Sequence, residues 1–118
     1  MRVKDAVGRF GEDAAVRYLE DAGLRIVERN WRCREGEIDI VARDGPVLVF
    51  CEVKTRSGAG FGHPAEAVDR AKVARIRRLA VRWLAEHRPE HGDLRFDVVS
   101  VERSRTAPPR IVHLRGAF

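Results

Sequence analysis

Hydrophobic and polar residues alternate over five stretches of the chain, and two longer stretches have the spacing of amphipathic helices. The helical stretches are residues 4–22 and 64–88, and Pro64 suits the first turn of the second. The strand-like stretches are 24–34, 36–43, 47–56, 94–102 and 109–118. The order α-β-β-β-α-β-β predicts a single α/β domain over residues 1–118, with helices packed on a mixed sheet.

Four charged residues interrupt the second and third strand-like stretches, which are otherwise apolar. They are Glu37, Asp39, Glu52 and Lys54. Charges are costly on buried strands, so these positions need an explanation. Side chains alternate along a strand, which places Glu37 and Asp39 on one face of the first strand and Glu52 and Lys54 on one face of the second.

The turn between these two strands decides whether the two charged faces coincide. A two-residue turn at residues 44–45 places Asp39 opposite Phe50 and diagonal to Glu52. A four-residue loop over 44–47 places Asp39 directly opposite Glu52. Both registers gather Asp39, Glu52 and Lys54 on one face, whereas a three-residue loop without a bulge would separate the two acids.

Two carboxylates on such neighbouring positions repel each other unless a positive charge lies between them. A divalent cation bound by oxygen ligands would supply that charge, and so would Lys54. A solvated ladder of charges on an edge strand explains the same pattern without any site.

The charge of the chain indicates a class of partner. The formal net charge is +5 and the pI is about 10.0, which suits a polyanion such as nucleic acid. No apolar run approaches the roughly 20 residues of a membrane span, and the N-terminus lacks the apolar core of a signal peptide. We therefore expect a cytoplasmic protein with no membrane partner, in which Cys33 and Cys51 stay reduced.

Asp39 is followed after twelve residues by Glu52-Val53-Lys54. This spacing resembles the PD-(D/E)xK motif of the restriction-endonuclease-like superfamily, although Ile38 stands where the motif is named for Pro. The stretches GRFGEDAAVRYLEDAGLRIVERNWRCREGEIDIVARDG, LVFCEVKTRSGAGFGHPAEAVDRAKVARIRRLA and RFDVVSV are similar to the YraN-like family of uncharacterised bacterial proteins, which is related to Holliday-junction resolvases. The similarity covers roughly residues 8–102.

The resemblance implies a restriction-endonuclease-like fold and a metal-dependent endonuclease that cuts DNA, including branched or repair intermediates. It implies that Asp39 and Glu52 hold Mg²⁺ or Mn²⁺, with the Val53 carbonyl as a third ligand. Glu12 on the first helix would complete the site, and Lys54 would orient the attacking water or stabilise negative charge. A first-turn acid favoured by the helix dipole is the simpler explanation of Glu12 taken alone.

Partners follow by the same analogy. Resolvase-like relatives are often dimers, so a homodimer is an expectation for this chain. DNA is the favoured nucleic acid. A nucleic-acid-binding protein that keeps the fold without catalysis is the alternative, and the intact Asp39, Glu52 and Lys54 favour the enzyme. Glu37 shares the face of Asp39 without an assigned role.

Basic residues outside the motif are candidates for contacts to nucleic acid. Thr55 and Arg56 follow the motif lysine, and a stripe on the second helix consists of Lys72, Arg75, Arg78 and Arg82. A solvated helix face explains the same stripe. The glycine-rich residues 58–62 are expected to form a loop, whose role the sequence does not decide.

Overall fold

The structure is a computed structural model that describes residues 3–57 and 69–118. Two helices and five strands form in the predicted order. Their bounds are α1 (Val3–Asp21), β1 (Arg25–Cys33), β2 (Gly36–Asp44), β3 (Val47–Ser57), α2 (Arg70–His87), β4 (Leu94–Arg103) and β5 (Arg110–Leu114).

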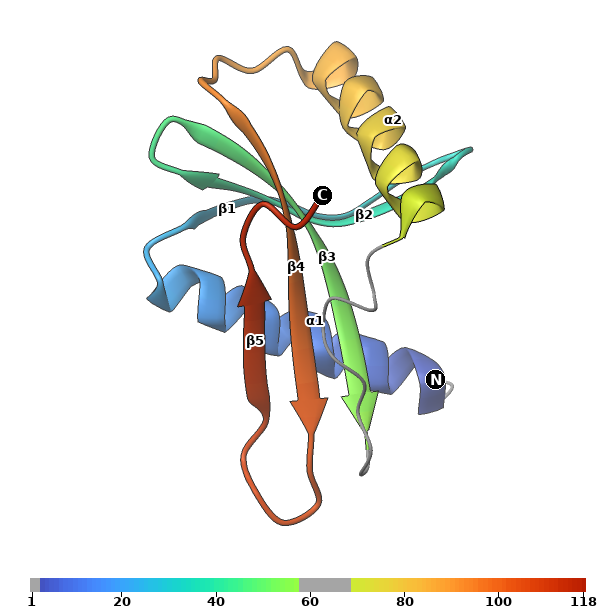
Figure 1. Ribbon diagram of the computed structural model, residues 1–118, viewed down its shortest axis with the longest axis vertical. Helices are drawn as coiled ribbons and strands as arrows, with labels where there is room; N and C mark the ends of the chain where they lie inside the picture. Colours follow the sequence, from blue (N-terminus) through green and yellow to red (C-terminus); the bar gives the residue numbers. More distant parts are fainter. Residues whose placement is uncertain (1–2, 58–68) are drawn as a thin grey trace.

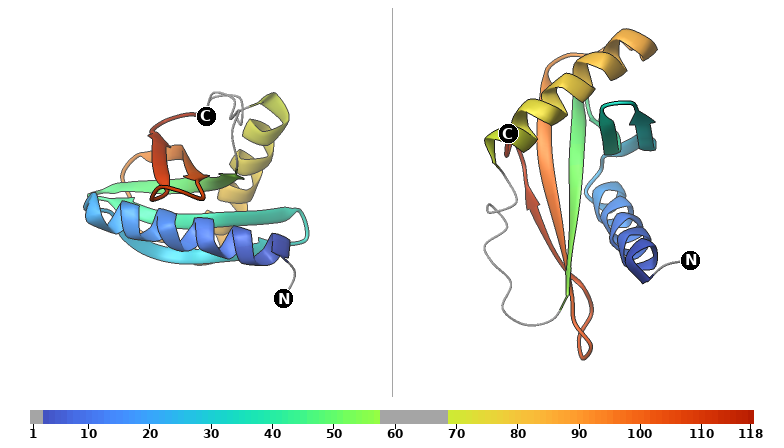
Figure 2. Two further views of the ribbon diagram at one scale, coloured as in Figure 1. Left: turned by 90° about the horizontal axis from the view of Figure 1, so that it is seen from below. Right: turned by 90° about the vertical axis from the view of Figure 1, so that its right-hand side faces the viewer.

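The five strands form one mixed sheet in the order β1-β2-β3-β4-β5. Strands β3 and β4 are parallel because α2 crosses over between them, and every other neighbouring pair is antiparallel. Helix α1 covers one face of the sheet and α2 packs on the other (Figure 1 and Figure 2). The predicted α/β fold with a mixed sheet and flanking helices is confirmed.

Side-chain alternation gives the sheet two apolar faces, and each helix buries one of them. Against α1, the core includes Leu19, Ile40 and Val49. Against α2, it is built around Phe50 and Trp83, whose rings meet edge to face at 5.7 Å. Trp83 is 1% exposed and Trp31 is 7% exposed, so both tryptophans pack in the core.

Helix α2 begins later than the sequence predicts. Asp69 is extended (φ −138°, ψ 168°), and its carboxylate accepts a hydrogen bond from the Lys72 backbone N–H, so it caps the helix at Arg70. The predicted continuous helix over 64–88 is therefore interrupted at Asp69, and α2 begins at Arg70. Residues 58–68, which include Pro64 and the predicted glycine-rich loop, lie outside the described part of the chain.

The β2–β3 turn fixes the register on which the charged residues depend. Asp44 pairs with Val47 and Ile40 pairs with Cys51, so the turn consists of Gly45 and Pro46. Gly45 has φ 60°, a left-handed conformation that glycine adopts without strain. This register aligns Asp39 with Glu52, as the four-residue loop over 44–47 predicted, but the turn has only the two residues 45–46. The predicted turn at 44–45, with Asp39 opposite Phe50, is wrong because Asp44 still pairs with Val47.

Gly11 lets α1 approach β3 closely. A Cβ atom built on Gly11 would lie 1.8 Å from Oγ1 of Thr55 and 3.0 Å from its Cβ. A Cβ atom built on Gly8, three residues earlier on the same helix, meets nothing within 4 Å. The position of α1 on the sheet, and with it that of the neighbouring Glu12, therefore requires glycine at residue 11.

Gly11→Ala should lower the free energy of unfolding by about 1–3 kcal/mol, because the helix must move away from Thr55. Gly8→Ala is the matched control and should stabilise the protein by about 0.5–1 kcal/mol, because alanine is the better helix former. Urea denaturation of both variants measures these changes. Equal stabilisation by both substitutions would contradict the close contact between α1 and β3.

Candidate metal centre

The side chains of β2 change faces of the sheet at Asp39. Ile38 packs on the α2 side of the sheet, whereas Ile40 packs on the α1 side, so the two residues do not share the face that simple alternation predicts. Across from Asp39, Asn30 of β1 lies between the pairs Trp31–Ile38 and Arg29–Ile40 and has φ 54°. Asparagine tolerates this left-handed conformation better than most residues do, and the two strands reverse their faces together at this point.

The Asp39 carboxylate accepts a hydrogen bond from a backbone N–H of β3 that has no backbone partner on β2. The paired ladder between β2 and β3 ends at Ile40 and Cys51, and Oδ2 of Asp39 accepts a hydrogen bond of 2.8 Å from the Val53 N–H. The N–H and C=O groups of one strand residue point to the same side, so the Val53 carbonyl faces this edge as well. Its role as a cation ligand stays a prediction.

Three carboxylates from two elements gather at this edge. Glu12 of α1 and Glu37 and Asp39 of β2 each offer an oxygen, and these oxygens all lie within 4.8 Å of one another. We call these three residues the acidic cluster. Opposite oxygen ligands of Mg²⁺ lie about 4.2 Å apart, at about 2.1 Å from the ion each, so the spacing of these oxygens is close to that of the ligands of Mg²⁺ or the similar Mn²⁺.

Glu37 therefore has a place in the site that the sequence did not reveal. Glu37 lies two residues before Asp39, so alternation indicated that the two side chains share a face of the strand. The reversal of β2 at Asp39 is what brings both side chains next to α1. Arg32 pairs with Glu37, and Arg29 lies 4.0 Å from Glu12. These two arginines offset part of the negative charge from the β1 side.

The environment of Asp39 raises its pKa to about 7. Burial is the largest cause, and the nearby charges of Glu37 and Glu12 add to it, whereas the hydrogen bond from Val53 opposes it. A divalent cation among these oxygens would favour the ionised form.

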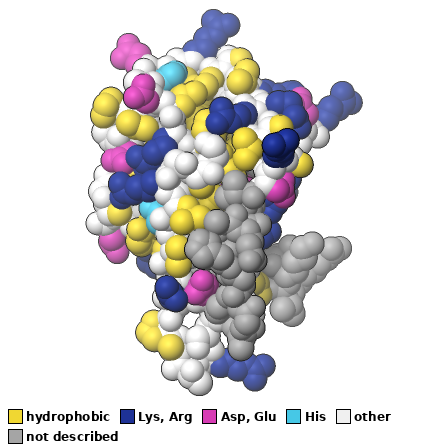
Figure 3. Space-filling model, viewed as in Figure 1, with side chains coloured by type: hydrophobic (Ala, Val, Ile, Leu, Met, Phe, Trp, Pro, Cys, Tyr) yellow, Lys and Arg dark blue, Asp and Glu magenta, His cyan; other side chains and the backbone are white. Residues whose placement is uncertain are grey.

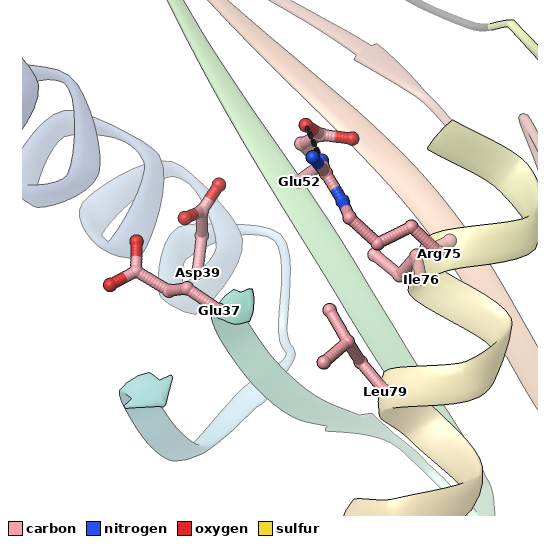
Figure 4. Close-up of a pocket in the computed structure, with 6 residues that line it drawn as sticks. All are labelled: Glu37, Asp39, Glu52, Arg75, Ile76 and Leu79. Carbon is pink, nitrogen blue, oxygen red and sulfur yellow. Dashed lines mark hydrogen bonds and ion pairs between the residues drawn. The ribbon is translucent and has the colours of Figure 1, made fainter. Parts of the chain in front are cut away.

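Glu52 lines the same cavity as Glu37 and Asp39 but has a different partner. The cavity measures about 220 Å³ and is lined by Glu37, Asp39, Glu52, Arg75, Ile76 and Leu79. Figure 4 shows Glu52 meeting Arg75 of α2, and the two groups lie 3.3 Å apart. Asp39 and Glu52 thus share a cavity, but Asp39 lies beside Glu12 of α1 and Glu52 beside Arg75 of α2, rather than on the one face that alternation predicts. Glu52 lies outside the acidic cluster.

Lys54 is exposed on β3 beyond Val53. The positive charge of Lys72 in the first turn of α2 lowers the pKa of Lys54, and burial adds to this effect. The two lysines therefore place positive charge beside the open edge of β3.

The residues predicted to contact nucleic acid fall into two groups. Thr55 packs against α1 at Gly11, so its hydroxyl lies in a contact between elements. Lys72 and Arg75 stand beside the motif residues, whereas Arg82 pairs with Glu35 at the turn between β1 and β2. Lys and Arg side chains gather over α2 (Figure 3). Arg78 of this helix is exposed. Contact with nucleic acid stays a prediction for these residues and for Arg56.

No helix in the described part of the chain is long and apolar enough to cross a membrane. The two cysteines are free, with Cys51 buried and Cys33 partly buried.

Comparison with known proteins identifies close relatives along the whole chain. The model of the uncharacterised protein family UPF0102 matches residues 11–101. A UPF0102 protein of Frankia alni is 64% identical over 118 residues, which is 100% of this chain and 98% of the relative. A UPF0102 protein of Streptomyces griseus is 55% identical over 117 residues, 98% of each chain. These matches confirm the resemblance to the YraN-like family.

The raised pKa of Asp39 predicts how stability depends on pH when no cation is bound. Because the pKa rises from 3.8 to about 7 on folding, the folded state holds the proton more tightly, and stability falls as the pH increases from about 4 to about 7. Asp39→Asn removes this dependence. The variant should match the wild type near pH 4 and exceed its stability near pH 8. Chemical denaturation across this range, in chelator, provides the measurement, and parallel profiles for the two proteins would contradict the assignment.

Proposed function

We propose that this chain, which belongs to the uncharacterised protein family UPF0102, is a divalent-metal-dependent endonuclease that hydrolyses phosphodiester bonds in DNA. One observation carries the proposal. At the point where β2 leaves β3, three carboxylates lie within 4.8 Å of one another, Glu52 lines the same cavity as two of them, Glu37 and Asp39, and the charges of Lys72 and Glu52 act on Lys54.

The roles of the acidic residues follow from their positions. Glu12, Glu37 and Asp39 would hold Mg²⁺ or Mn²⁺, with Glu52 and the Val53 carbonyl available from β3. A bound cation would polarise the phosphate and lower the pKa of a water molecule. The Val53 N–H keeps the Asp39 carboxylate oriented towards this edge.

Lys54 would act on the phosphate and on the attacking water. Its lowered pKa makes the neutral amine more accessible than in an isolated lysine, which suits a group that orients or deprotonates water. When charged, the same group would stabilise negative charge that develops on the phosphate. Lys72 and Arg75 would bind neighbouring phosphates of the strand.

The substrate and assembly rest on coarser arguments. The net charge of +5 and the cations on α2 suit a nucleic-acid backbone. DNA, branched or repair intermediates, and a homodimer that makes two symmetric cuts are proposed from the resemblance to Holliday-junction resolvases.

A nuclease assay tests the proposal directly. Linear, single-stranded and branched DNA, and RNA of matched length, are incubated with Mg²⁺ or Mn²⁺, and with chelator as the blank. Asp39→Ala and Glu52→Ala should each reduce cleavage at least about 100-fold and leave binding of the nucleic acid largely intact, because they remove cation ligands and no phosphate contact.

Glu86→Ala is the matched control, because Glu86 is an exposed acid on α2 away from the cavity, and it should cut like the wild type. Wild-type protein that binds DNA without cutting it under any of these conditions would contradict the enzyme. It would favour a nucleic-acid-binding protein that retains the fold.

A further inference from the structure

The Glu52 carboxylate is only half satisfied. Its Oε1 atom lies 3.3 Å from Nη2 of Arg75. Its Oε2 atom is buried and has no hydrogen-bond partner in the described part of the chain. A buried carboxylate oxygen without a donor is unfavourable, so the arrangement leaves Glu52 able to gain from a second positive partner.

Glu52 lies where such a partner could reach it. It borders the cavity that Glu37 and Asp39 also line, with Ile76 and Leu79 as apolar neighbours. In Figure 4 Arg75 extends from α2 to Glu52, on the side of the cavity away from Glu37 and Asp39. The Arg75 guanidinium therefore contacts the Glu52 carboxylate on one side, and Glu37 and Asp39 lie on the opposite side of the cavity.

Arg75 is well placed to exchange its partner. Its side chain is 44% exposed and that of Glu52 is 16% exposed, so one partner of the pair is open to solvent. A single, partly exposed ion pair of this kind contributes little to stability. Lys72, three residues earlier on α2, lies beside Lys54, so the positive charges of Arg75 and the two lysines occupy neighbouring positions. A phosphate placed there would relieve their repulsion and offer the guanidinium a two-pronged partner.

We propose that Arg75 is a positioning residue that holds Glu52 away from the cation site until a phosphate of the nucleic acid takes over its guanidinium. The inference rests on the proposed function of the site. Its consequence is positive coupling: nucleic acid releases Glu52 for the cation, and the cation, by holding Glu52, releases Arg75 for the phosphate. Such coupling must be equal in both directions.

Calorimetric titration with Mn²⁺ tests this inference without a catalytic readout. Each protein is titrated alone and in the presence of a phosphorothioate DNA duplex, which resists hydrolysis. Arg75→Gln should bind Mn²⁺ about tenfold more tightly than the wild type when no duplex is present, because Glu52 is then free. The duplex should increase the Mn²⁺ affinity of the wild type by about the same factor and that of Arg75→Gln very little.

Two further variants separate this role from a general effect of charge. Arg77→Gln removes the same charge from the same helix, but Arg77 stacks over Phe96, so its Mn²⁺ affinity should match that of the wild type. Arg75→Lys keeps the charge and loses the planar fork, and should give an intermediate affinity. Melting temperatures confirm that each variant is folded.

The outcomes distinguish the two proposals. Wild-type protein that binds Mn²⁺ and the duplex, with the same Mn²⁺ affinity and the same coupling in Arg75→Gln as in Arg77→Gln, would overturn the role of Arg75 alone. Failure of every variant to bind Mn²⁺ would overturn both the role of Arg75 and the metal-dependent endonuclease.

Discussion

The site depends on one hydrogen bond, from the Val53 N–H to the carboxylate of Asp39. Backbone groups at a strand edge need partners, and here an aspartate side chain replaces the strand that has turned away. That replacement is possible because β1 and β2 reverse their faces together, with Asn30 in a left-handed conformation opposite Asp39. This hydrogen bond gives the Val53 N–H of β3 a partner and also fixes the Asp39 carboxylate beside the strand edge. One interaction therefore serves both the fold and the candidate site.

The charges around this edge are separated by element. Carboxylates from α1 and β2 lie within 4.8 Å of one another, whereas the cations Lys72 and Arg75 come from α2 and lie beside Lys54 and Glu52 of β3. Glu52 lines the same cavity as Glu37 and Asp39 and pairs with Arg75. The carboxylates of the acidic cluster repel one another, and so do the positive charges of Lys54, Lys72 and Arg75. A cation bound to the carboxylates and a phosphate bound to the positive side chains would relieve both repulsions. The two ligands would then support each other's binding.

Local patterns in the sequence were sufficient for the order of the elements and for the neighbouring positions of Asp39 and Glu52 on β2 and β3, which line one cavity. The place of Glu37 was not predictable, because it depends on a reversal of β2 that strict alternation cannot express. The start of α2 at Arg70 was missed because the helix-capping role of Asp69 was not recognised in the sequence. The partner of Glu52 was also not predictable, since its contact with Arg75 joins elements far apart in the sequence.

The most direct test of the account is a titration of isotope-labelled protein with Mn²⁺, followed by nuclear magnetic resonance. Paramagnetic broadening falls off steeply with distance, so it locates the bound cation without reference to any activity. The account predicts that the amide signals of Glu12, Glu37, Asp39 and Val53 broaden first, because these residues surround the same edge. Broadening that begins at other acids, such as Asp69 or Glu90, or that never becomes local, would contradict a metal centre where β2 leaves β3.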